Sequence, residues 1–305
     1  MLSAQLAVSQ KTEIYTDYKG TPCQSLNARF YTVLEKTDSG WLRREYFLEG
    51  LKLHKKALFE DQACTIQQGD YLYFHANGTL EGMGKKVHNL LEGACMRFYA
   101  NGAMLDSAFY HNGRPVKDRF LWHPNGMMSD SITHANDSID VQVSWFEDGA
   151  LESAGLYLHG KMHGNWQFFH PNGKLAAKER YRNNKLESAD FFDENGLPLT
   201  DTSRVNKEAE FRGGIAGWQR YLDRSLFWPP GYQFGNGNLA VVVVEFTVGA
   251  DGKVSRAEVV VPFHPVFDNI ALRAVKSSPP WQPAISHNRK MKHEFRQPVV
   301  FTQPE

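Results

Sequence analysis

Residues 160–174 read Gly160-Lys161-Met162-His163-Gly164-Asn165-Trp166-Gln167-Phe168-Phe169-His170-Pro171-Asn172-Gly173-Lys174. The end of this stretch, an aromatic residue followed three positions later by Asn-Gly, returns at a fixed interval along the chain. The glycines of six copies lie 24, 24, 23, 24 and 23 residues apart: Asn77-Gly78, Asn101-Gly102, Asn125-Gly126, Asp148-Gly149, Asn172-Gly173 and Asn195-Gly196. The aromatic residues that precede them are Phe74, Phe98, Trp122, Trp145, Phe169 and Phe192. A period of this length indicates a repeat architecture.

Each repeat contains two turn signals. Asn-Gly between apolar runs is typical of a two-residue type I′ hairpin turn, in which both central residues have positive φ. A second set of residues that tolerate positive φ lies eleven positions after the first five glycines: Asn89, Gly113, Asp137, Gly160 and Asn184. Each unit is therefore predicted to form two short strands. Because a single hairpin is marginal in water, we expect the hairpins to stack into an array.

The stretch of residues 160–174 resembles the MORN-variant repeats of bacterial proteins, which are also found in YwqK-type antitoxin proteins. The pattern of that family is roughly N-G-K-x-x-G-x-W-x-x-Y-x-x-N-G-K, and this copy follows it closely. The resemblance covers residues 70–200. Other copies are looser, since Lys117 and Asp140 stand at the repeat position of Gly164. The resemblance implies an array of β-hairpins.

Length and composition limit the functional class. The chain has 305 residues, for which two domains are the prior expectation, and its formal net charge is zero. There is thus no whole-molecule attraction to nucleic acid or to anionic membranes. No stretch approaches the roughly 20 apolar residues of a membrane helix. Cys23, Cys64 and Cys95 fit no zinc or redox motif, so we interpret them as buried or free thiols; a Cys23–Cys64 bridge stays open if the protein is exported.

The segments that flank the repeats are less regular. Residues 1–69 form a β-rich segment that we expect to cap the array, and Tyr46, three residues before Glu49-Gly50, indicates a degenerate first repeat. Met1 to Gln5 have neither a basic region nor an apolar core, so at most the tail of a signal peptide is expected there. The repeats are assigned to residues 70–200 and a linker to residues 201–210.

A different pattern occupies residues 211–305. Helical spacing over residues 213–227 places Ile215, Trp218, Leu222 and Leu226 on one apolar face, and a second helix is predicted over residues 265–277. Strands are predicted over residues 239–248, 253–261 and 292–301, with Asp251-Gly252 as the turn between the first two. The predicted fold is mainly β: a stacked β-hairpin array followed by an α+β domain with two helices and three antiparallel strands.

The order of these elements resembles the C-terminal domain of TonB, the energy transducer of Gram-negative bacteria. The resemblance is carried by Gly213-Gly214, Tyr221-Leu222, Trp228-Pro229, Val241-Val242-Val243-Val244-Glu245-Phe246-Thr247-Val248, Asp251-Gly252-Lys253-Val254, Asp268, Ala271-Leu272-Arg273, Trp281-Gln282-Pro283-Ala284 and Pro298-Val299-Val300-Phe301. It implies a periplasmic module that captures an extended peptide of an outer-membrane receptor by strand addition. The membrane helix and Pro-rich linker of TonB have no counterpart in this sequence, so we do not expect this chain by itself to draw on the proton gradient.

The same resemblance implies which residues would receive the peptide. They form the start of the last predicted strand: Lys292, His293, Glu294, Phe295, Arg296 and Gln297. A third strand at a sheet edge offers unpaired backbone donors and acceptors, and its charges guard against aggregation. The alternative is a solvated edge strand that binds no partner.

Other candidate sites are weak. His159 and His163 have a spacing that binds zinc on a helix, but they fall in a predicted turn and strand, so no metal or cofactor is predicted. The positions two residues before the signature Asn or Asp hold His75, Tyr99, His123, Phe146 and His170. We interpret this set as an aromatic packing stripe. The basic segment 287–296 lacks a nucleic-acid recognition motif, and no catalytic motif stands in its required context.

The leading hypothesis is a non-enzymatic, periplasmic or envelope-associated scaffold that binds a protein or peptide partner, such as an outer-membrane receptor segment. The six repeat aromatics would be structural or would contact that partner. The alternative is an antitoxin-like protein that neutralises a protein toxin through the aromatic array. A third hypothesis, an enzyme acting on envelope glycans, lacks an identifiable pair of catalytic carboxylates. Oligomeric state and partner identity stay open.

Overall fold

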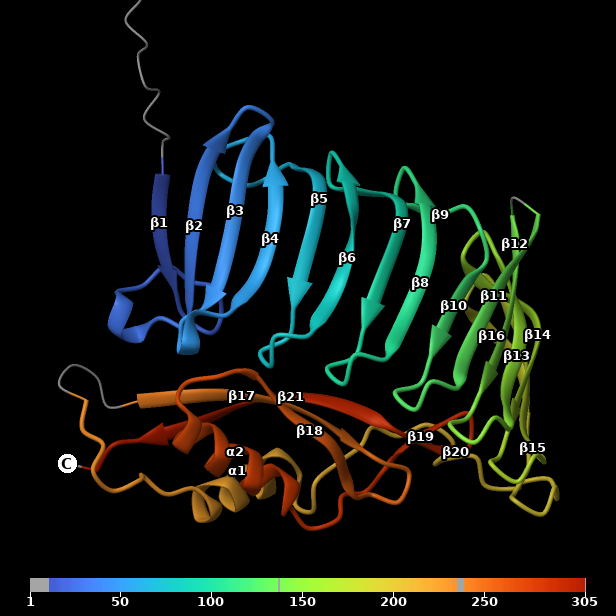
Figure 1. Cartoon of the computed structure of the whole chain (residues 1–305). Helices are drawn as coiled ribbons and strands as arrows, with labels where there is room; N and C mark the ends of the chain where they lie inside the picture. Colours follow the sequence, from blue (N-terminus) through green and yellow to red (C-terminus); the bar gives the residue numbers. More distant parts are fainter. Residues whose placement is uncertain (1–10, 137, 235–238, 305) are drawn as a thin grey trace, which may run out of the picture.

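The computed structural model describes residues 11–136, 138–234 and 239–304. It contains two modules: a long, bent sheet of antiparallel hairpins, and a smaller module of helices and strands that lies along one turn edge of that sheet (Figure 1). Met1 to Gln5 and Asp137, on which a leader and a turn were predicted, lie outside the described residues.

The long sheet is built from strands that pair in sequence order, each antiparallel to the next, with the short β9 paired to β8. Its strands are β1 (Lys11–Thr16), β2 (Phe30–Thr37), β3 (Gly40–Phe47), β4 (Leu53–Phe59), β5 (Gln67–Phe74), β6 (Leu80–Val87), β7 (Leu90–Phe98), β8 (Met104–His111), β9 (Arg114–Pro115), β10 (Arg119–Trp122), β11 (Met128–Asn136), β12 (Ile139–Trp145), β13 (Leu151–Leu158), β14 (Lys161–Phe169), β15 (Leu175–Arg182) and β16 (Lys185–Phe191). The predicted hairpin array is therefore confirmed.

The sheet begins well before the first complete repeat. β1 to β4 pair antiparallel with one another and with β5, and the β3–β4 hairpin has the same bulged register as the repeat hairpins. Short 3-10 turns, η1 (Ser25–Asn27) and η2 (Glu49–Leu51), lie in the connections. β3 and β4 form a hairpin around Glu49-Gly50, where a degenerate repeat was expected. The residue boundaries between capping segment, repeats and linker stay a prediction.

The two turns of each repeat differ in geometry, and the type I′ turn is not the one at Asn-Gly. Gly78 has φ of 91° and donates its N–H to His75 O, but Asn77 is not among the residues with positive φ. The Asn-Gly turns are thus type I turns followed by a left-handed glycine, a three-residue hairpin loop. The type I′ turns lie at the second signal instead: His88-Asn89, Asn112-Gly113, His159-Gly160 and Asn183-Asn184, with both φ values positive in each pair. Prediction of type I′ geometry at Asn-Gly was wrong.

A β-bulge follows the first five Asn-Gly or Asp-Gly turns and the corresponding turn at Glu49-Gly50. In the β5–β6 hairpin Tyr73 pairs with Gly82 and Phe74 with Leu80, so Glu81 has no partner. The residues left over in this way are His54, Glu81, Leu105, Ser129, Glu152 and Ala176. A bulge re-aims the side chain of its extra residue. These six residues, here called the bulge column, lie beside the turn edge that faces the smaller module.

The smaller module has the predicted elements and one hairpin that was not predicted. Its helices and strands are α1 (Gly214–Ser225), β17 (Leu239–Val248), β18 (Val254–Val261), α2 (Pro265–Lys276), β19 (Ala284–Ser286), β20 (Arg289–Met291) and β21 (His293–Thr302). β17 is the central strand between β18 and β21, and β19 pairs with β20 as a separate two-stranded sheet. The order, with two helices and three antiparallel strands, confirms the predicted α+β domain.

The side chains of the three-stranded sheet lie on two faces. Val242, Val244 and Phe246 of β17 face the helices and join a core with Trp218 and Phe267. The expected inward position of Ile215 is wrong, since this residue is 90% exposed. It lies in the first turn of α1, beside Phe295 and Gln297 of the edge strand β21.

The opposite face of this sheet lies against the repeats. Val243 and Val261 pack with Phe30 and Phe47 of the long sheet into a second, smaller core. The Arg29 guanidinium lies 4.2 Å from the ring centre of Phe263, and its Nε donates to Val241 O over 3.3 Å. The two modules are therefore joined by apolar packing and not only by the connecting chain.

Candidate functional site: the open strand and the groove beside it

β21 is an edge strand. It pairs along its whole length with β17, from Leu239 with Thr302 to Val248 with His293. Its other side pairs with no strand in the described part of the chain. Pro298 lies in its middle, opposite Val243, and proline is tolerated at sheet edges because it cannot donate to a ladder. The predicted position at an edge is thus where the structure places this strand.

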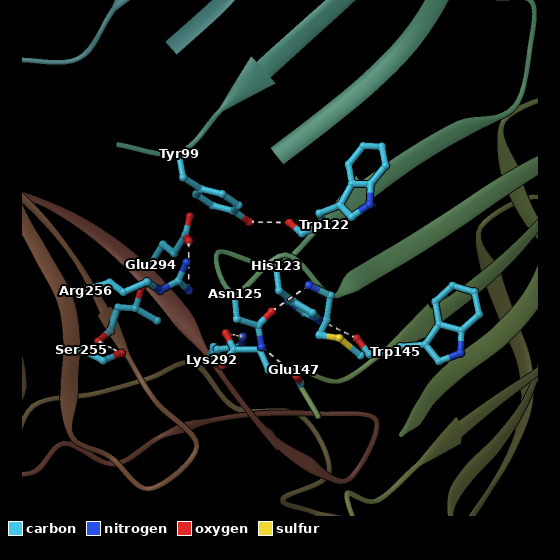
Figure 2. Close-up of polar contacts among 12 residues, drawn as sticks. Tyr99, Trp122, His123, Asn125, Trp145, Glu147, Ser255, Arg256, Lys292 and Glu294 are labelled. Atoms are coloured by element: carbon cyan, nitrogen blue, oxygen red, sulfur yellow. Dashed lines mark hydrogen bonds and ion pairs between the residues drawn. The ribbon is translucent and has the colours of Figure 1, made fainter. Parts of the chain in front are cut away.

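The six residues expected to receive a peptide are divided between two environments. His293, Phe295 and Gln297 are half-buried on the helix side, whereas Glu294 and Arg296 are exposed on the face toward the repeats. The sixth, Lys292, precedes β21 and is already engaged: its Nζ lies 2.5 Å from Glu147 Oε1, in the turn between β12 and β13 (Figure 2). The structure brings five of the six together on β21.

A groove separates the turn edge of the repeats from the outer face of the three-stranded sheet. It consists of two adjoining cavities of about 340 and 530 Å³ that share Glu81, Glu245, Glu258 and Arg296. Three residues of the bulge column, His54, Glu81 and Leu105, line it. The sequence did not predict this groove, because neither the bulges nor the docking of the modules is visible in the repeat pattern.

The groove is rich in partly buried charge. Arg296 lies 3.2 Å from Glu245, and Arg256 lies 4.0 Å from Glu294 (Figure 2 shows the latter pair). Burial raises the pKa of Glu245, against the opposing effect of Arg296. Burial also raises the pKa of Glu258, which is paired across the sheet with Glu245. Like charges at directly opposed positions destabilise a sheet, so this arrangement costs stability.

An apolar pocket lies on the other side of β21. Its volume is about 200 Å³, and it is lined by Trp218, Trp281, Phe246 and Phe295 together with Ile215 at the start of α1. The Trp218 indole N–H donates to Gln297 Oε1 over 2.9 Å, which fixes the indole beside the strand. The open edge therefore has a polar groove on one face and an apolar pocket on the other.

The repeat aromatics are half-buried. Phe74 and Phe98 line the groove, whereas the other four are not among its lining residues. Figure 2 shows the rings of Trp122 and Trp145 pointing away from Arg256, Lys292 and Glu294. Their backbone carbonyls instead accept hydrogen bonds from the preceding repeat. The pairs are His75 Nε2 with Phe98 O, Tyr99 Oη with Trp122 O, His123 Nε2 with Trp145 O, and His170 Nε2 with Phe192 O, at 2.8 to 2.9 Å. Four of the five residues of the predicted packing stripe, all but Phe146, thus form a column of hydrogen bonds.

The signature asparagines form a second column. Asn125 Oδ1 accepts from the N–H of Met127 within its own turn, and Asn125 Nδ2 donates to Glu147 O in the next (Figure 2). Asn77, Asn101 and Asn172 make the same two kinds of bond. Asp148 accepts from Ala150 N but has no amide to donate. The repeat signature therefore encodes contacts between repeats as well as turns.

The β19–β20 hairpin joins the modules at the bent end of the array. His287 stacks on Phe168, with ring centres 3.6 Å apart, and its Nδ1 lies 2.9 Å from Glu179 Oε2. Asn288 Nδ2 donates to Phe192 O, and Arg289 Nη1 donates to Glu152 O. The sequence pattern does not predict this hairpin; its turn residues His287 and Asn288 both have positive φ in the structure.

Metal binding and disulfides find no support in the described part of the chain. It holds no group of three or more His, Cys, Asp or Glu side chains that could bind a metal ion. Cys23, Cys64 and Cys95 are all free thiols, so the alternative of a Cys23–Cys64 bridge is not realised. No helix among these residues is both long enough and apolar enough to span a membrane.

Comparison with known families confirms both resemblances. No curated protein matches the chain. Residues 162–187 match a family model described as MORN repeat variant, and this stretch covers β14 and β15. Both matched families are non-catalytic, and together they suggest a protein-interaction role in the cell envelope. Residues 236–302, with β17, β18, α2 and β21, match the family described as Gram-negative bacterial TonB protein C-terminal.

Proposed function

We propose that this chain is a periplasmic binding protein whose C-terminal module captures an extended peptide of an envelope partner. The peptide adds as a fourth strand beside β21. The observation that carries this proposal is that one side of β21, His293–Thr302, pairs with no strand among the residues that the structure describes. Strand addition supplies main-chain hydrogen bonds for affinity and leaves alternate side chains to provide specificity.

Three features support capture over a merely solvated edge. Val300 on β21 is 46% exposed. An exposed β-branched residue on a bare edge strand favours aggregation, so its presence there favours a strand that is covered by a partner. Glu294 and Arg296 guard the first half of the strand against self-pairing without closing it. The array is fixed to the other face of the sheet and to Lys292, so it holds the module in one orientation and leaves the edge accessible.

The test is site-specific photo-cross-linking of the full chain in a Gram-negative periplasm. A photoreactive residue replaces Val300 on β21 or, as the control, Leu186 on β16; each native side chain is 46% exposed. The expected result is a cross-link from position 300 to an extended terminal segment of an outer-membrane protein. Added peptide of that segment should protect the amides of β21 from hydrogen exchange. Cross-links from position 186 alone would reject capture at β21 and favour the antitoxin-like alternative.

A further inference from the structure

The open strand presents two different surfaces to any strand that joins it. Successive side chains of a strand point to opposite faces, so a peptide beside β21 alternates between the same two faces. On the helix side its neighbours are Phe295 and Gln297, and on the groove side they are Glu294 and Arg296. Side chains directly opposite one another across strands lie close enough to interact.

The helix side calls for an apolar side chain. The pocket of about 200 Å³ beside Phe295 is walled by Trp218 and Trp281, and an apolar cavity of about 150 Å³ suffices for benzene. Ile215, at its mouth, is 90% exposed, more than any other large apolar residue described as exposed. An apolar side chain of the partner would fill this pocket and cover Ile215.

On the groove side, Glu294 and Arg296 favour charged residues of opposite sign in a defined order along the peptide. The Glu294 side chain is 78% exposed and that of Arg296 is 60% exposed, so both can pair with a partner despite their contacts with Arg256 and Glu245. All strands of this sheet are antiparallel. A fourth antiparallel strand passes Arg296 first, then Phe295, then Glu294.

We propose that the captured peptide carries the order acidic, apolar, basic, with the acidic residue opposite Arg296, the apolar side chain in the pocket beside Phe295, and the basic residue opposite Glu294. This inference rests on the proposed strand capture at β21. It adds a direction and a three-residue preference to that capture.

The experiment measures binding of three labelled nonapeptides to the full chain by fluorescence anisotropy. Their central residues are Glu-Leu-Lys, Lys-Leu-Glu or Glu-Ser-Lys, each flanked by the same Thr-Val-Thr segments. Glu-Leu-Lys should bind about fivefold more tightly than Lys-Leu-Glu, since cross-strand ion pairs are individually modest. It should bind about tenfold more tightly than Glu-Ser-Lys, which buries no apolar side chain.

Variants assign the effect to residues. Ile215→Ser should weaken the Leu peptides and leave Glu-Ser-Lys unchanged, whereas the control Leu186→Ser, on the far end of the array, should change none. Combined Glu294→Gln and Arg296→Gln should abolish the preference between the two charge orders. Equal binding of all three peptides, or a preference for Lys-Leu-Glu, would overturn this inference and leave strand capture standing. Failure of every peptide to bind or to protect β21 from hydrogen exchange would overturn both.

Discussion

At the scale of single residues, the sequence predicts one function for the signature asparagine, a turn, whereas the structure shows two. Asn125 closes its own turn through Oδ1 and reaches the following turn through Nδ2. Only asparagine supplies both an acceptor and a donor at this reach. Asp148 keeps the first function and lacks the second, so the column is interrupted between the fourth and fifth copies.

Asp148→Asn should therefore stabilise the protein. The new amide would lie toward Pro171 O, the position that corresponds to Glu147 O for Asn125. A net gain of about 0.5–1 kcal/mol is expected for one partly exposed hydrogen bond. Urea denaturation checks it, with Asn125→Asp as the matched reverse change, expected to lose a similar amount. A loss of stability in Asp148→Asn would show that the column does not continue across this repeat.

Glu45 makes the free energy of unfolding decrease as the pH falls into the acid range. Burial by itself raises the pKa of this carboxyl, but the contact with His54 and the charges of Lys55 and Arg43 outweigh burial and lower it to about 2. Because the folded-state pKa lies below the unfolded value, the stabilisation is present above about pH 4.5 and is lost as the pH falls toward 2. It amounts to about 3 kcal/mol.

The measurement is the free energy of unfolding between pH 7 and pH 2.5 for the native chain and Glu45→Gln. The variant should be less stable at pH 7, and the difference should shrink on acidification. A difference that stays constant with pH would contradict the assigned ion cluster.

At the scale of elements, the strands were predictable and the turn geometry was not. Period and alternation locate each hairpin, because stacked strands must bury one side of every repeat. The turn type depends on what the Asn side chain binds, and its bond to the backbone two residues on favours the type I geometry with a left-handed glycine. Ile215 fits the apolar spacing of α1 equally well, and only the position of the sheet edge decides that it is exposed.

One part of the candidate site could be predicted from the sequence and another part could not. The edge position of β21 follows from element order, so its residues could be named in advance. The groove and the apolar pocket depend on bulges and on packing between segments far apart in sequence, such as Glu81 beside Glu258. The β19–β20 hairpin is too short for periodicity to reveal.

The turn assignment predicts opposite effects at two positions. His159 has φ of 51°, a left-handed conformation that Asn adopts more readily, so His159→Asn should stabilise by about 0.5 kcal/mol. Gly126 has φ of 84° and open space where a Cβ would stand, so Gly126→Ala should cost about 1 kcal/mol through backbone strain alone. Thermal unfolding of both variants checks these values; a neutral Gly126→Ala would refute the left-handed glycine.

At the scale of the whole molecule, the contacts between the two modules determine whether the array fixes the orientation of the open strand. Apolar packing around Phe47 and Val243 holds one end of the module. The hairpin tip at His287 holds the other, where Glu179 is only 2% exposed. Two separated attachments resist rotation, so the modules should behave as one body.

His287→Ala tests these contacts. It removes the stacked ring from Phe168 and one of two side-chain partners of the buried Glu179 carboxylate, which keeps the Tyr181 hydroxyl; the loss should cost about 2 kcal/mol. Hydrogen exchange should quicken in β19, β20 and the nearby strands β13 to β16, while β1 to β4, attached at the other end, keep their protection. Lys290→Ala, three residues after His287 and on an exposed side chain, is the matched control and should change neither quantity. Unchanged exchange in the variant would mean that the apolar attachment alone orients the modules, and the position of the open strand relative to the repeats would then depend on Phe30, Phe47, Val243 and Val261.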